Sequence, residues 1–236
     1  YSLDAFLLAD FASECWESEG SHHAVETGRP RVADLGTGTG VVALLLAYRC
    51  STLRLFGIDL QEHSLRIAMA NARGSCLRER VDFFLADVRR ADRWFGSGGI
   101  DGAVINPPYR KTGSGRLSPN PVRAMSRHEL TLPLQSWLEA AAHMIRFDGN
   151  LIFCHLAERE FEVVRAVESA GFQLVRLCRV HPMKHRPPMI ILAEATHRMN
   201  VLENKAEILS PLIVYKRPGM YTEGIRNIYE RFGINL

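Results

Sequence analysis

Short apolar stretches alternate with helical patterns through most of the chain, and this alternation constrains the fold more than any other feature. The expected strands are 31–35, 53–58, 81–86, 100–105 and 150–155, and the expected helices lie near 40–50, 62–73, 127–147 and 158–169. Strands that alternate with helices build βαβ units, in which the strands run parallel. The sequence therefore predicts an α/β fold with a doubly wound, mostly parallel sheet.

Two later stretches, 172–180 and 189–195, are separated by a short loop that contains proline. We expect them to form an antiparallel C-terminal hairpin that completes a seven-stranded sheet. An amphipathic helix capped by Ser2 or Asp4 precedes the first strand. No repeat or linker divides the chain, so we expect a single domain. Its parts are an N-terminal helix at 2–16, a cofactor-binding half at 31–105 and a substrate-side part at 106–236.

The composition is that of an ordinary soluble globular protein, with 236 residues, 47% of them hydrophobic and 23% charged. No run of 18 or more apolar residues is present, and we recognise no signal peptide. The five cysteines are scattered without a C-x-x-C pair, which favours buried thiols in a reducing cytoplasm over disulfides or metal ligands. We expect a cytoplasmic protein without a metal or a membrane segment. Because the chain begins at Tyr1, we also expect residues before it to be missing.

Charge is distributed unevenly along the chain. The first 100 residues hold 11 Lys/Arg and 13 Asp/Glu, whereas residues 176–236 hold 10 Lys/Arg and 5 Asp/Glu. A basic C-terminal part permits a partner that carries phosphate, such as a nucleic acid, but does not identify one.

A glycine-rich turn with glycines at 36, 38 and 40 joins the first expected strand to a helix. Glycines let the backbone turn tightly and let a ligand approach its amides, and the helix N-terminus favours negative charge. The next two strands end in Asp59 and Asp87, and an acid at the position of Asp59 can accept hydrogen bonds from ribose hydroxyls. Together these strand ends predict a crevice for an adenosine-containing cofactor.

The fourth expected strand is followed directly by the sequence Asn106-Pro107-Pro108-Tyr109. The two prolines fix φ and remove amide donors, and Pro107 favours an extended backbone at Asn106. The result is a stiff shelf with a side-chain amide, backbone carbonyls and an aromatic face. These groups can bind a planar amine, although the motif by itself is equally compatible with a purely structural turn.

Dinucleotides and S-adenosyl-L-methionine both suit the expected crevice. The dinucleotide fingerprint G-x-G-x-x-G is not met, because the glycines fall at 36, 38 and 40. Asp34 would also place negative charge near a pyrophosphate, whereas a sulfonium cofactor with an ammonium group tolerates this acid. We therefore expect S-adenosyl-L-methionine as the cofactor.

These motifs together resemble those of the Rossmann-like S-adenosylmethionine-dependent methyltransferases with an NPPY motif, which have the class I methyltransferase fold. Within them the chain is most similar to the bacterial tRNA1(Val) adenine-N6 methyltransferase family. The stretches that carry this closer resemblance are 1–11, 127–129, 180–182, and 212–215 together with 221–223.

The resemblance implies an N-methyltransferase that acts on an adenine amino group in tRNA. It implies catalytic roles for Asn106, Pro107 and Tyr109. The implied cofactor-binding residues are Asp34, Gly36, Thr37, Gly38, Gly40, Asp59, Leu60, Asp87, Val88 and Asn106. The candidate substrate-binding residues are Tyr109, Arg110, Lys111, Arg127, His128, Lys184 and Arg186.

Several alternatives remain open at the level of the sequence. The same NPPY chemistry serves protein glutamine methyltransferases that act on release factors, and methyltransferases that act on amino groups in rRNA or DNA. The basic C-terminal part argues against the protein substrate. The glycine spacing and Asp34 argue against a dinucleotide-dependent oxidoreductase. A nucleic-acid-binding module without catalytic activity would not need an intact NPPY motif.

Overall fold

The computed structural model describes residues 3–17, 29–107, 132–197 and 206–236. Within them a 9-stranded sheet has the order β3-β2-β1-β4-β5-β7-β6-β8, and β9 also pairs with β6. The strands are β1 (Arg31–Leu35), β2 (Arg54–Asp59), β3 (Val81–Leu85), β4 (Ile100–Ile105), β5 (Ile145–Leu156), β6 (Gln173–His181), β7 (Ile190–Thr196), β8 (Glu207–Ile208) and β9 (Leu212–Ile213).

The strands from β3 to β5 run parallel, and β7 is inserted antiparallel between β5 and β6. This confirms the predicted doubly wound sheet, and its seven main strands include the predicted C-terminal hairpin. Two short strands, β8 and β9, extend the sheet at β6 and were not predicted. A separate hairpin of β10 (Tyr215–Arg217) and β11 (Met220–Tyr221) follows them.

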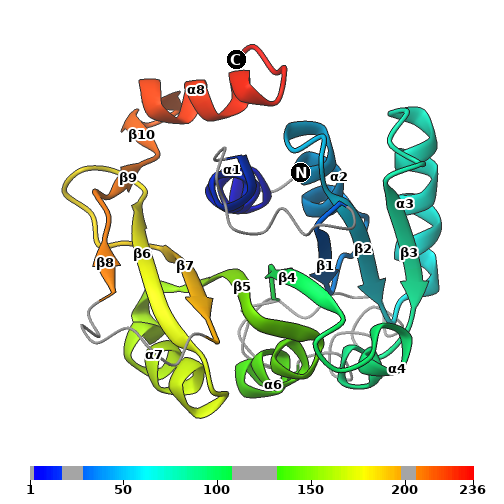
Figure 1. Ribbon diagram of the computed structural model, residues 1–236. Coiled ribbons are helices and arrows are strands. Elements are labelled where there is room, and N and C mark those ends of the chain that lie inside the picture. Colours follow the sequence, from blue (N-terminus) through cyan, green and yellow to red (C-terminus); the bar gives the residue numbers. More distant parts are fainter. Residues whose placement is uncertain (1–2, 18–28, 108–131, 198–205) are drawn as a thin grey trace, which may run out of the picture.

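Helices cover both faces of the sheet. One apolar core includes side chains of α1 (Leu3–Glu17), α2 (Val41–Arg49) and α8 (Glu223–Arg231), and α3 (Glu62–Gly74) packs against β2 and β3. The other core lies under α6 (Leu134–Met144) and α7 (Glu160–Ser169), with α4 (Asp92–Phe95) beside them. The sheet curves around α1, and α8 lies across the open side of this curve (Figure 1).

Helix α1 is buried around most of its circumference, which corrects the expectation of an amphipathic helix. Every residue from Ala5 to Ser13 is buried, because the helix packs against β5, β7, α2 and α8. A helix that is apolar on all sides belongs in a core. Its buried carboxylate, Asp10, accepts two hydrogen bonds from Nη1 of Arg231 in α8, at 2.9 and 3.0 Å.

Strand β5 begins earlier than expected. The predicted helix 127–147 ends at Met144, and its first residues lie outside the described part. The pairing of β4 with β5 shifts register between Ile100 and Gly102, so that β5 bulges around Gly149. A Cβ at Gly149 would meet Ile145 Cγ2 at 2.4 Å, so the absence of a side chain at this position permits the bulge.

The segment 87–99, between the third and fourth expected strands, contains the 3₁₀ helix η1 (Val88–Arg90) and α4. A second 3₁₀ turn, η2 (Ala157–Arg159), precedes α7. Among the described residues, no helix has the length and apolar character needed to cross a membrane.

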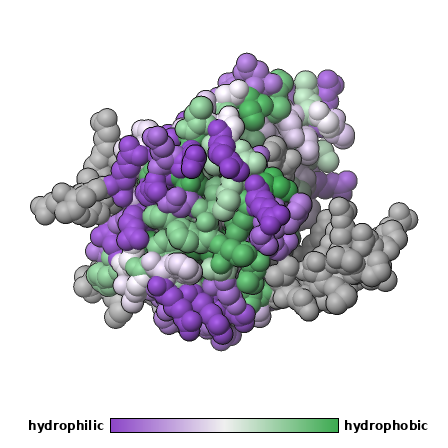
Figure 2. All heavy atoms as spheres, turned by 90° about the vertical axis from the view of Figure 1, so that its right-hand side faces the viewer, coloured by the Kyte–Doolittle hydropathy of each residue, from purple (hydrophilic) through white to green (hydrophobic). Residues whose placement is uncertain are grey.

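The edge of the sheet at β3 carries exposed apolar side chains. Leu85 is 56% exposed and Trp94 is 62% exposed, and the Trp94 ring lies 5.8 Å from that of Phe84. Figure 2 shows the molecule from this side, with apolar side chains gathered in the middle of the face.

Candidate active site

The glycine-rich turn between β1 and α2 lies at the edge of the sheet where the parallel strands have their carboxyl ends. Gly36, Gly38 and Gly40 have φ values of 74°, 55° and 80°, which L side chains rarely adopt. A Cβ at Gly36 would meet the Trp137 ring at 2.7 Å, and one at Gly40 would meet Ala68 at 2.9 Å. A Cβ at Gly38 would meet nothing within 4 Å. Side chains therefore pack against the turn at Gly36 and Gly40, whereas the space beside Gly38 is open and a ligand can reach the backbone there.

Asp34 stabilises this turn from inside. Its Oδ2 accepts hydrogen bonds from Thr37 Oγ1 at 2.7 Å and from the amide of Ala43 at 3.1 Å, and its side chain is buried. Burial raises the pKa of Asp34 to about 6, against the lowering effect of these two hydrogen bonds. The predicted role of Asp34 in cofactor binding stays a prediction.

Asp59 ends β2 beside the turn. Its Oδ2 accepts from the amide of Gly38 and its Oδ1 from the amide of Gln61, both at 2.8 Å. A carboxylate oxygen can accept more than one hydrogen bond, so both oxygens retain capacity for ribose hydroxyls. Leu60, the next residue, is 48% exposed and offers an apolar surface beside this carboxylate.

Asp87 follows β3 and caps η1. Its Oδ1 accepts from the backbone amide and from Nε of Arg89, both at 3.0 Å. The hydrogen bonds from Arg89 lower the pKa of Asp87 below its usual value. Asp87 thus has a structural role as a helix cap, and its predicted role in cofactor binding stays a prediction.

A small hollow of about 140 Å³ lies between η1, α4 and α6. Its lining residues are Val88, Arg89, Asp92, Ala140 and His143. Val88 belongs to the predicted cofactor set, but ligand pockets usually enclose about 300–1,000 Å³. We therefore do not assign this hollow to the cofactor.

Asn106 and Pro107 follow β4 on the strand next to β1. The thiol of Cys154 in β5 donates a hydrogen bond to Asn106 Oδ1 at 3.2 Å. The sequence predicted buried thiols but not this contact, because the two residues are 48 positions apart. The expected burial holds for Cys50, Cys154 and Cys178, whereas Cys76 is exposed.

The strand register brings the glycine turn, Asp59 and Asn106 side by side. Leu35 pairs with Ile58 in β2 and with Ile105 in β4, so that Gly36, Asp59 and Asn106 are the next residues of three neighbouring strands. Neighbouring strands lie about 4.8 Å apart. An adenosine cofactor held at Asp59 and an amine held at Asn106 would therefore meet over the glycine turn.

The remaining predicted residues divide into two groups. Tyr109, Arg110, Lys111, Arg127 and His128 lie outside the described residues. Lys184 and Arg186 are exposed in the loop between β6 and β7. Within the described part of the chain, no group of three His, Cys, Asp or Glu side chains could hold a metal ion.

The site has features that fit S-adenosyl-L-methionine. Gly38 leaves space for a ligand against the backbone, and the carboxylate of Asp59 faces the same turn. The glycine spacing and the buried acid at Asp34 are unsuited to a pyrophosphate. The arrangement suits an adenosine-containing cofactor without a pyrophosphate better than it suits a dinucleotide.

Known proteins are similar to this chain in sequence and in fold. A family model described as a methyltransferase domain matches residues 32–109. A predicted O-methyltransferase from Agrobacterium tumefaciens has the same fold, with a TM-score of 0.67 over 97% of this chain and 96% of that chain, at 18% identity.

Two curated relatives are similar over most of the chain. A tRNA1(Val) (adenine(37)-N6)-methyltransferase of Porphyromonas gingivalis is 30% identical over 203 residues, which cover 84% of this chain and 78% of that protein. The protein of the same name from Tolumonas auensis is 30% identical over 166 residues, covering 70% of this chain and 68% of the relative. The chain thus belongs to the tRNA1(Val) (adenine(37)-N6)-methyltransferase family of S-adenosylmethionine-dependent N-methyltransferases.

Proposed function

We propose that this protein transfers a methyl group from S-adenosyl-L-methionine to the exocyclic N6 amino group of an adenine in tRNA. The observation that carries the proposal is the register that sets Asn106 beside the glycine turn and Asp59. On this proposal, the amide that binds the acceptor amine and the carboxylate that binds the adenosine lie on neighbouring strand ends. The relatives named above, which are 30% identical, support tRNA as the acceptor.

Asp59 is proposed to hold the ribose hydroxyls, since its oxygens already lie at the turn and retain acceptor capacity. The open backbone at Gly38 would receive the methionine part of the cofactor. When bound, S-adenosyl-L-methionine supplies an electrophilic methyl group on a positively charged sulfur. The full proposed cofactor set is Asp34, Gly36, Thr37, Gly38, Gly40, Asp59, Leu60, Asp87, Val88 and Asn106.

Asn106 and Pro107 are proposed to orient the acceptor amine. The side-chain oxygen of Asn106 and the carbonyl oxygen of Pro107 would each accept a hydrogen bond from one N–H of the amine. An adenine amine is a poor nucleophile because its lone pair is delocalised into the ring. Holding both hydrogens favours a pyramidal nitrogen and turns the lone pair towards the methyl group. Catalysis then consists largely of positioning two reactants in line.

The target base has to leave any helical stack to reach this amide. Tyr109 is proposed to stack on the flipped base, with a contribution of about 1–3 kcal/mol. The proposed RNA contacts are Arg110, Lys111, Arg127, His128, Lys184 and Arg186. Of these, the structure describes Lys184 and Arg186, both exposed.

Transfer of a labelled methyl group tests the acceptor class. Purified protein would be incubated with total tRNA, rRNA, DNA and protein from cells that lack it. We expect label in tRNA, recovered as N6-methyladenosine after digestion. Label in a release factor and not in tRNA would replace the proposed function with protein glutamine methylation.

Two substitutions should separate cofactor binding from transfer. Asp59→Ala should weaken cofactor binding by about 1–3 kcal/mol, because hydroxyl groups in the site lose their acceptor. Asn106→Ala should lower kcat at least about 100-fold and weaken cofactor binding much less than Asp59→Ala does, because the main proposed contact of Asn106 is with the acceptor amine. Calorimetry with S-adenosyl-L-methionine and single-turnover kinetics measure the two effects. Asn227→Ala, at an exposed position of α8, is the control. Near-normal turnover of Asn106→Ala would reduce the NPPY shelf to a structural turn.

A further inference from the structure

The β10–β11 hairpin is joined to the loop between β6 and β7. The amide of Val214 donates to the carbonyl of His181 at 2.8 Å, and the amide of Tyr215 donates to that of Pro182 at 2.9 Å. Strand β9 also runs parallel to the end of β6, with Leu212 paired to Val180. Figure 1 shows this loop beside β9 and close to β10. The loop and the hairpin therefore form one continuous surface.

This surface carries only positive charges over two long stretches of sequence. No Asp or Glu occurs between Ser169 and Ala193, or between Ile208 and Thr222. The exposed basic side chains are Lys184, Arg186, Lys216 and Arg217. Elsewhere in the described chain, arginines such as Arg176 and Arg179 pair with carboxylates. The four exposed cations of the loop and hairpin have no carboxylate partner among the described residues.

Both parts of the surface are held firmly. Nδ1 of His181 donates to the carbonyl of Arg186 at 2.7 Å, and the amide of Arg186 donates to the carbonyl of Met183 at 2.9 Å. In the hairpin, the rings of Tyr215 and Tyr221 stack with centroids 5.0 Å apart and planes 14° apart. The positive charges thus stand on a prearranged support, which limits the entropy lost when a partner binds.

An aromatic chain connects the hairpin to the core. The ring of Tyr221 lies 5.8 Å from that of Tyr229 in α8, and Tyr229 lies 4.6 Å from Phe6 in α1. Thr222, at the end of the hairpin, accepts a hydrogen bond from the amide of Ile225 and caps α8. The hairpin therefore keeps a defined position relative to the body of the enzyme.

The surface stands at the same edge of the sheet as Asn106. Ile105 pairs with Phe153, and Ile190 pairs with both Leu156 and Val180, so that β4, β5 and β6 all end at this edge. Four strand spacings separate β4 from β9, which corresponds to about 19 Å along the sheet. A macromolecule with a base at Asn106 can reach the hairpin, whereas a free nucleotide cannot.

We propose that the hairpin residues Lys216 and Arg217, together with Lys184 and Arg186, bind the sugar–phosphate backbone of tRNA away from the target base. This inference rests on the proposed function, since it gives a second contact to the same RNA. Regularly spaced phosphates are the partner that suits four unpaired cations on a rigid support. The contact would fix the position of the RNA on the protein, while Asn106 and Pro107 bind the target amine.

The test is charge reversal of the hairpin in the full chain. In Lys216→Glu/Arg217→Glu we expect tRNA binding to weaken at least about tenfold at about 0.1 M salt, with loss of about 1.4 from the slope of log affinity against log salt. Cofactor affinity should be unchanged. The neutral variant Lys216→Gln/Arg217→Gln should lie between this variant and the unmodified protein, and thermal unfolding would check that each variant is folded.

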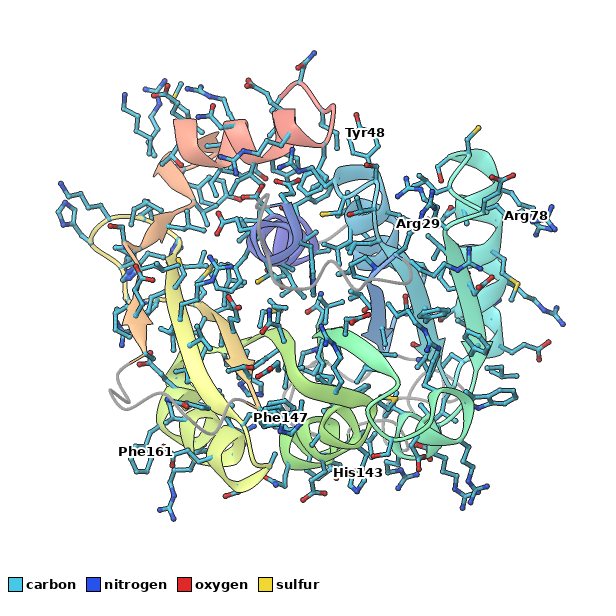
Figure 3. All side chains as sticks on the ribbon, viewed as in Figure 1. Arg29, Tyr48, Arg78, His143, Phe147 and Phe161 are labelled. Carbon is cyan, nitrogen blue, oxygen red and sulfur yellow. The ribbon has the colours of Figure 1, made fainter. Side chains whose placement is uncertain are left out.

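The matched control is Arg73→Glu/Arg78→Glu, which changes the net charge by the same amount. Both arginines are exposed, and they lie on α3 and the turn after it, at the β3 edge. Figure 3 shows Arg78 on the side of the molecule opposite the hairpin. We expect this control to bind tRNA like the unmodified protein.

The outcomes separate the inference from the proposed function. If the unmodified protein binds and methylates tRNA, and the hairpin reversal does so with the same affinity and salt slope, the inference is wrong and the function stands. An equal loss in the control would also overturn it, because the effect would then reflect net charge alone. If the unmodified protein methylates no tRNA, the proposed function fails, and the inference fails with it.

Discussion

Asp34 shows how the side chains of the site depend on their surroundings. Its position at the end of the first strand could be predicted, because that position follows from local sequence. Its partners, Thr37 and Ala43, could not, because they depend on the side-chain rotamer within the folded turn. The same holds for Asp87, which binds Arg89, and for the bond between Cys154 and Asn106. The sequence could therefore locate the candidate site but not its hydrogen bonds.

The raised pKa of Asp34 predicts a pH-dependent stability. Because the folded pKa of about 6 lies above the ordinary value of 3.8, the folded protein holds an extra proton between these values. The contribution of Asp34 to the free energy of unfolding therefore falls as pH rises from about 4 to 6. At pH 7 the free energy of unfolding is therefore lower by about 2–3 kcal/mol than it would be with Asp34 at its ordinary pKa. Asp34→Asn should be relatively more stable at pH 7 than at pH 4, which urea unfolding without cofactor measures. A difference that does not vary with pH would contradict the burial of a charged group.

Cys154 is expected to position Asn106. Cys154→Val removes the donor at nearly constant volume, and loss of one hydrogen bond of about 0.5–1.5 kcal/mol should lower kcat about 2- to 12-fold. The Michaelis constant for the cofactor should not change, and Cys154→Ser should recover much of the rate. Cys178→Val makes the same change at another buried cysteine on the same face of the sheet and serves as the control. Equal rates for Cys154→Val and Cys178→Val would exclude this role.

At the scale of elements, the bulge in β5 depends on one glycine. In Gly149→Ala the added methyl group would lie 2.4 Å from Ile145 Cγ2 and 2.7 Å from the carbonyl oxygen of Asp101. We expect a loss of about 1–3 kcal/mol in the free energy of unfolding. Gly74→Ala, at the end of α3, meets nothing within 4 Å and should be neutral or stabilising by up to about 1 kcal/mol. Denaturant unfolding of both variants makes the comparison, and equal stabilities would show that the bulge tolerates a side chain.

The long elements were predictable and the short ones were not. Strands β1 to β4 and helices α2 and α3 lie within one or two residues of the expected ranges, because each has a complete apolar pattern. Strands β8 to β11 have two or three residues each, too few for any periodicity. The early start of β5 was also missed, since a bulge interrupts the pattern on which a sequence-based assignment depends.

For the molecule as a whole, the mostly parallel sheet with its antiparallel C-terminal hairpin was predicted, while the position of α1 was not. A helix rich in apolar residues can lie on a sheet or within a core, and the difference depends on what covers its outer face. Here that cover is α8, more than 200 residues later in the chain. The two edges of the sheet also differ, with exposed apolar side chains at β3 and exposed cations beyond β6.

The pairing of α1 with α8 has a consequence for how the chain is made. Asp10 and its partner Arg231 are 221 positions apart, and Glu14 and Arg176 are 162 apart. On the ribosome, α1 emerges more than 200 residues before α8, so the apolar surface that α8 covers stays exposed while those residues are made. Exposed apolar surface of this kind promotes aggregation. We therefore expect α1 to depend on chaperone protection in the nascent chain and to become protected from hydrogen exchange only after α8 has emerged.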